Sequence, residues 1–122
     1  MEVLLKKTEI IDKRFQDLLE FGNRVLSSRR APPEGVLGDF SVDLEKSQEW
    51  STSTAQLLKS LFGPESEYYK RFQDSFQSAG YYSDMVSGVA VLKAAWGDYS
   101  KGYLVEVRSL VEAEIFGLCA GI

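Results

Sequence analysis

The sequence predicts an all-α protein, an antiparallel four-helix bundle with a long C-terminal helix. Apolar residues recur every three or four positions almost throughout the 122-residue chain, which is the period of an amphipathic helix. Stretches rich in proline or glycine divide this pattern into four segments, and no internal repeat or β-type alternation competes with it. We therefore expect one domain, residues 1–122, with helices at about 2–30, 43–62, 64–79 and 82–117.

The first predicted helix covers residues 2–30. One face of it carries an apolar residue every seven positions, at Leu4, Ile11, Leu18 and Val25. Arg29 and Arg30 fall in its expected last turn, where cations favour the negative end of the helix dipole. Two prolines then end the helix, because proline lacks the backbone N–H and disfavours helix in the residue before it.

Residues 31–42 are expected to form an ordered connector that lies over one end of the bundle. The segment contains two prolines and two glycines, which are typical of turns. It also carries four apolar residues that we expect to hold it against the bundle, namely Val36, Leu37, Phe40 and Val42.

The second predicted helix, 43–62, begins with acidic residues that suit a helix N-terminus. Its first half also carries small hydroxyl residues at helical spacing, Ser47, Ser51 and Thr54. We interpret them as a packing or solvated face rather than as nucleophiles. Gly63 and Pro64 then mark the end of this helix and the first position of the next, which is expected to run from 64 to 79.

The fourth predicted helix is the longest, because its apolar stripe keeps its phase through Gly97 and Gly102 to about residue 117. It is about seven residues longer than the first helix. Its C-terminal end is strongly apolar, and a monomer would expose that end to water as an unusually large apolar patch. We therefore expect a homodimer that buries Val107, Leu110, Val111, Ile115, Phe116 and Leu118. The alternative is that the connector 31–42 folds over this end instead.

The composition argues against an enzyme. The chain has no histidine, so it lacks Ser-His and Cys-His nucleophile pairs and imidazole metal ligands. It has no glycine-rich phosphate loop, and Cys119 is its single cysteine. Carboxylate pairs such as Glu45 and Glu49 can be placed on a solvated helix face. We therefore predict no catalytic residues, no cofactor and no metal.

The charge pattern argues against nucleic-acid binding, although a homodimer could bring Arg29 and Arg30 of two copies together. The net charge is −4, and the basic side chains of residues 1–30 are interleaved with acidic ones, as in i, i+4 pairs on a solvated helix. The N-terminus does not have the apolar stretch of a signal peptide. The sequence also has no run of about 20 apolar residues, which is the length needed to span a bilayer. We expect a cytoplasmic protein.

Aromatic residues gather in the third and fourth predicted helices and the turn between them. One interpretation is a pocket between these helices that binds a small amphipathic ligand through Tyr69, Tyr82, Trp96, Tyr99 and Tyr103. The other is a packed aromatic core with tyrosine hydroxyls at its rim.

Two stretches, Leu57-Leu-Lys-Ser-Leu-Phe-Gly-Pro-Glu-Ser and Leu110-Val-Glu-Ala-Glu-Ile-Phe, are part of a wider resemblance over residues 44–116. The chain resembles the N-terminal helical segment of uncharacterised bacterial proteins that are often carried by mobile or accessory DNA. In those proteins a second helical domain follows the Ala-Glu-Ile-Phe position. The resemblance implies a free-standing version of the module, as in a gene cassette, but no chemistry. We therefore predict a non-enzymatic interaction or adaptor module that self-associates through its C-terminal helix.

Overall fold

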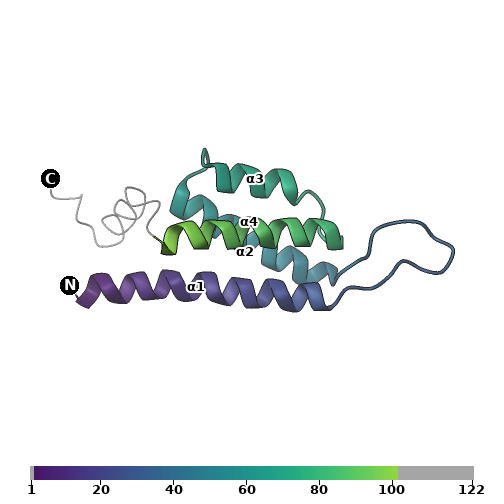
Figure 1. Cartoon of the computed structure of the whole chain (residues 1–122), viewed down its shortest axis with the longest axis horizontal. Coiled ribbons are helices and arrows are strands. Elements are labelled where there is room, and N and C mark those ends of the chain that lie inside the picture. Colours follow the sequence, from purple (N-terminus) through teal and green to yellow (C-terminus); the bar gives the residue numbers. More distant parts are fainter. Residues whose placement is uncertain (1, 102–122) are drawn as a thin grey trace.

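The computed structural model describes residues 2–101, with side chains placed from residue 9 onward. These residues form four α-helices that pack together: α1 (Glu2–Ser27), α2 (Leu44–Phe62), α3 (Glu67–Ser75) and α4 (Tyr82–Ser100). Successive helices run in opposite directions, and α4 lies alongside both α1 and α3 (Figure 1). The predicted all-α, four-helix architecture is confirmed. None of the described helices is both long enough and apolar enough to cross a membrane.

Trp50 lies at the centre of the core, where all four helices meet. Its side chain is fully buried, and its indole Nε1–H donates a hydrogen bond to the carbonyl of Leu18 at 2.8 Å. Gly22 of α1 and Gly88 of α4 lie against the indole, so that a Cβ added at either glycine would be 3.0 Å from a Trp50 side-chain atom. These two glycines give the indole its space between α1 and α4.

Helix α1 ends at Ser27, three residues earlier than predicted. Arg30 instead pairs with Ser41 in an antiparallel bridge, in which the Arg30 N–H and the Ser41 N–H each donate to the other residue's carbonyl at 2.8 and 2.9 Å. Arg29 and Arg30 therefore lie beyond the helix, and Arg24 is the basic residue of its last turn. The bridge to Ser41 is a tertiary contact, which the local sequence does not encode.

Helix α3 is shorter than the predicted 64–79. Pro64 is not its first residue, because Ser66 caps the helix by accepting a hydrogen bond from the Tyr69 N–H at 3.2 Å. The helix ends at Ser75, and the Asp84 carboxylate accepts a hydrogen bond from the Ser78 N–H at 3.0 Å in the turn that follows. The Ser66 cap therefore sets the start of α3 in place of Pro64. The turn held by Asp84 follows its end, which comes before the predicted residue 79.

Helix α4 starts at Tyr82, as predicted, and continues through Gly97 to Ser100. The rest of the predicted helix, with the residues expected at the dimer interface, lies outside the described residues. The long C-terminal helix therefore stays a prediction.

The connector between α1 and α2 projects from the end of the bundle, beside the N-terminus of α4 (Figure 1). Val42 is buried, as predicted, but Val36 and Leu37 are 55% and 99% exposed, so the prediction that they hold the connector against the bundle is wrong. A turn that the Val36 N–H closes on the Pro33 carbonyl at 2.9 Å, with Gly35 at φ +83°, directs them into solvent. Because the connector lies at the opposite end of α4 from Ser100, it does not cover the C-terminal end of that helix.

Backbone hydrogen bonds fix the base of the connector. The Tyr82 N–H donates to the Phe40 carbonyl at 2.8 Å, and the Val42 N–H donates to the Gly80 carbonyl at 3.0 Å. Ser41 also bridges to Tyr81. The end of α1, the connector and the α3–α4 turn are thereby joined at one end of the bundle.

Asp39 of the connector supplies the N-terminal cap that α4 does not get from its own N-cap residue, Tyr81. Its carboxylate accepts hydrogen bonds from the Ser83 hydroxyl and, at 3.0 Å, from the Ser83 N–H. The Ser83 hydroxyl, and after it the Ser83 N–H, lower the pKa of Asp39 below its ordinary value of 3.8. The ionised carboxylate also suits the positive end of the helix dipole.

The Asp39→Ala variant should have a lower melting temperature than the wild type at neutral pH, because it removes this cap. A carboxylate with a lowered folded-state pKa stabilises the fold fully above its unfolded-state pKa, and this contribution disappears as pH falls through the lowered value. The difference between variant and wild type should therefore shrink from about pH 6 to about pH 3. Thermal melts followed by circular dichroism across this range measure it.

Glu34→Ala is the matched control, since it removes a carboxylate from the same connector at a position with no hydrogen bond among the described residues. It should leave the melting temperature nearly unchanged at each pH. A constant difference between Asp39→Ala and the wild type over the whole pH range would contradict the capping role of the ionised Asp39.

Candidate functional site: the groove between α2 and α3

An open groove of about 600 Å³ lies between α2 and α3. We call it the α2–α3 groove. Residues of α2 that lie one helical turn apart line one side of it. Residues of α3 and of the two positions after it line the other side. Its lining combines two phenylalanine rings with hydroxyl, amide and ammonium groups. The polar side chains are Ser51, Thr52, Gln56, Lys59, Gln73 and Gln77.

The aromatic part of the groove is Phe72 and Phe76 of the α3 segment. Their rings are nearly parallel, at an interplanar angle of 5° and a centroid distance of 5.8 Å. Both rings also contact Trp50, with centroids 5.7 and 5.9 Å away. The groove therefore lies directly over the core, and its aromatic wall is held in place by Trp50.

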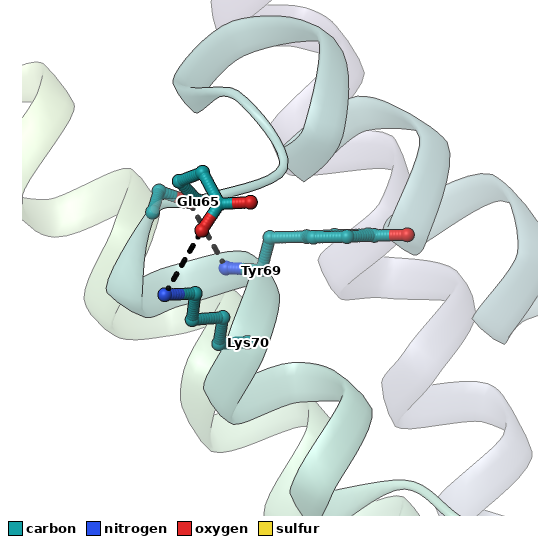
Figure 2. A network of polar contacts seen from close by, with 4 residues as sticks. Glu65, Tyr69 and Lys70 are labelled. Carbon is teal, nitrogen blue, oxygen red and sulfur yellow. Dashed lines mark hydrogen bonds and ion pairs between the residues drawn. The ribbon is translucent and has the colours of Figure 1, made fainter.

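Tyr69 forms one end of the groove, in the first turn of α3. Its hydroxyl oxygen accepts a hydrogen bond from Nε2 of Gln73, one turn later, at 2.9 Å. Figure 2 shows that the Tyr69 ring points away from Lys70 and Glu65, whose charged groups pair at 3.2 Å. The ammonium group of Lys70 is therefore neutralised outside the groove.

Four of the five predicted ligand-binding residues are described, and the structure does not bring these four together. Tyr82 and Tyr99 lie at opposite ends of α4, about 25 Å apart at the helical rise. The fully buried Tyr99 packs against Phe15, at 5.9 Å between ring centroids, and the half-buried Tyr82 contacts Phe40 of the connector at 6.3 Å. A single small pocket cannot contain both tyrosines.

Of the other three predicted residues, the two that the structure describes are also separated. Tyr69 lines the α2–α3 groove, whereas the partly buried Trp96 packs against the core. Tyr103 lies outside the described residues. Tyr69 lines, with Phe72 and Phe76, a groove that α3 shares with α2 rather than with α4. The predicted ligand-binding role of these residues stays a prediction.

Tyr68 makes the polar contact between α3 and α4 instead. Its hydroxyl donates to the Asp98 carboxylate at 2.5 Å, and its ring lies 4.8 Å from that of Phe62. Burial, together with the hydrogen bond and the negative charge of Asp98, raises the pKa of Tyr68 to about 12. This pair connects the helices and belongs to the packing rather than to the groove.

The sequence analysis missed Lys59 and the glutamines of the groove, because an exposed polar residue on a helix carries no signal of its own. One available signal was the polar series at helical spacing that begins with Ser51. From the sequence, this hydroxyl face is expected only as a packing or solvated surface. Packing is correct for Ser47 and Thr54, which are fully buried.

A second exposed feature is the connector tip, which we define as Val36 and Leu37. Leu37 is 99% exposed, although the hydrogen bonds described above fix the base of the connector. The other apolar surface expected from the sequence, Val107 to Leu118, lies outside the described residues. Within residues 2–101 no three histidine, cysteine, aspartate or glutamate side chains cluster as metal ligands would.

Comparison with known proteins gave no match to a family model, to a curated protein or to a solved structure. The resemblance to helical segments of bacterial proteins from mobile DNA therefore stays a prediction.

Proposed function

We propose that the chain is a non-enzymatic helical interaction module that self-associates. The observation that carries this proposal is the connector tip, where Leu37 is 99% exposed on a segment anchored at its base. A single exposed leucine is common on protein surfaces, but this one projects beside a second exposed apolar residue, Val36. An anchored loop also loses less conformational entropy on binding than a flexible one.

A second copy of the chain is the proposed partner. The apolar residues predicted at the interface, from Val107 to Leu118, follow α4 in the sequence, and Ser100 lies at the end of α4 away from the connector. In an antiparallel two-fold dimer, each connector tip contacts the C-terminal segment of the other copy, so the same pair of surfaces is used twice. This arrangement shields both sets of apolar side chains from water.

Size-exclusion chromatography with light scattering tests the proposal. We expect a mass of about twice 13.7 kDa at micromolar concentration for the wild type. Leu37→Asp and the double variant Leu110→Asp, Ile115→Asp should each yield monomers, because each places charge in the proposed contact. Glu34→Gln, a change on the same connector outside the tip, should leave the dimer intact.

Circular dichroism distinguishes a failed fold from a lost contact, since each variant should keep the helical spectrum of the wild type. A wild-type monomer throughout the micromolar range would overturn self-association. A dimer that survives both the Leu37 and the Leu110/Ile115 changes would overturn the proposed surfaces.

The second candidate function is the binding of a small amphipathic ligand, which the α2–α3 groove favours. The groove has a volume within the range of about 300–1,000 Å³ that is common for ligand sites, and it joins aromatic and polar groups in one place. This candidate is compatible with the first, because the groove is lined by neither the connector tip nor any residue after Gln77.

A further inference from the structure

We propose that the α2–α3 groove binds a small amphipathic anion with an aromatic body and one acidic group, which lies at Lys59. The inference rests on the second candidate function and adds to it the chemical class of the ligand. Three properties of the groove carry it: its aromatic wall, its single charge and the direction of its polar hydrogens.

The aromatic wall favours a flat apolar body. Phe72 and Phe76 stack within 5° of parallel, and Phe76 is only partly buried, so one ring of the pair still reaches the groove. Aromatic rings bind such a surface in offset or edge-on arrangements, which add to the gain from apolar burial. Both phenylalanines pack against Trp50, so the wall is held by core contacts.

The charge of the groove favours an acid. Lys59 is the single charged residue among the described side chains that line it, and no carboxylate faces it there. Lys59 forms no ion pair with any described residue, whereas Lys70 is paired with Glu65 on the other side of α3 (Figure 2). The ammonium group of Lys59 is therefore free to pair with a ligand anion.

The hydrogen-bond donors of the groove also favour an anionic ligand group. The hydroxyls of Ser51 and Thr52 donate to the carbonyl of Gln48, at 3.1 and 2.9 Å, so their hydrogens turn back into α2. Gln56 and Gln73 each use one amide N–H inside the protein, on Ser60 and Tyr69, and each keeps a second N–H. The N–H groups that remain, with the Lys59 ammonium, can donate to an anionic group.

The probe is 1-anilinonaphthalene-8-sulfonate, an aromatic anion whose fluorescence rises when it leaves water. We expect saturable 1:1 binding to the wild type at moderate salt. Lys59→Gln should weaken binding by about three- to fivefold, the range of a solvent-exposed ion pair. Lys93→Gln, an equal change of net charge on the exposed side of α4, should leave the dissociation constant within about twofold.

Two further measurements locate the site. Ala55→Trp fills the groove from its partly buried α2 side and should abolish binding while the helical circular dichroism spectrum is kept. The uncharged analogue N-phenyl-1-naphthylamine should bind wild type and Lys59→Gln equally, because it lacks the acidic group. Full binding to Ala55→Trp, or equal weakening by Lys59→Gln and Lys93→Gln, would overturn the proposal.

These results are independent of self-association. The oligomeric mass is measured by light scattering, and the connector variant Leu37→Asp leaves the groove residues unchanged. Binding of N-phenyl-1-naphthylamine without binding of the sulfonate dye would contradict the ligand class alone, and binding of neither would also contradict the second candidate function. A monomer that binds the dye contradicts only self-association.

Discussion

Trp50→Ala should lower the free energy of unfolding by about 3–5 kcal/mol, the largest effect expected for any single substitution in the described core. The indole is fully buried, contacts Phe72 and Phe76, and donates a hydrogen bond to the Leu18 carbonyl. Its removal leaves a cavity where α1, α2, α3 and α4 meet. Urea unfolding followed by far-UV circular dichroism measures the change without relying on tryptophan fluorescence.

Trp50→Phe and Trp96→Ala complete this test. Trp50→Phe keeps most of the aromatic volume but loses the hydrogen bond, so it should lower the free energy of unfolding by less than Trp50→Ala. This variant should fold even if the Trp50→Ala protein does not. Trp96 is only partly buried, and its replacement should cost less than that of Trp50. If Trp50→Ala lowers the free energy of unfolding no more than the substitution of an exposed residue does, the indole does not organise the core.

Gly88→Ala should also destabilise the protein, although alanine is the better helix former. The new Cβ would lie 3.0 Å from Trp50 and 3.1 Å from Phe76, and both rings are held by other core contacts. Overpacking of this kind costs about 1–3 kcal/mol, which exceeds the gain of about 1 kcal/mol from helix propensity. The expected result is a net loss, read from the same urea titration.

Gly97→Ala is the matched control on the same helix. A Cβ at Gly97 has no atom within 4 Å among its described surroundings, so helix propensity alone should act and the variant should gain up to about 1 kcal/mol. Opposite signs for the two substitutions are the expected outcome. A stabilised Gly88→Ala would mean that the indole moves easily and that the core is loosely packed.

Particular elements show how far the sequence could predict this structure. The periodic residues of α1, Ile11, Leu18 and Val25, are buried as predicted, because a heptad-spaced stripe on a long helix leaves few alternatives. The start of α4 at Tyr82 was also predicted. The ends of α1 and α3 were not, since Arg30 and Ser78 hydrogen-bond to residues from other segments.

The candidate site was less accessible to prediction. Aromatic spacing placed Tyr69, Tyr82 and Tyr99 in one pocket, whereas Tyr69 lines the α2–α3 groove and the other two lie at opposite ends of α4. The composition of a helix does not indicate which neighbour each face contacts. Only the packing shows that Lys59 lines the same groove as Phe72 and Phe76.

The sequence by itself determined the helical class, the presence of four helices within residues 2–101 and much of the apolar stripe of α1, because these depend on residue spacing within a segment. The tertiary structure decided the positions of the α2–α3 groove, the projecting connector and the Asp39 cap on α4. Each of these joins residues distant in the chain, as Asp39 and Ser83 do, and the energy of such contacts depends on how the helices pack. Local periodicity does not contain that information.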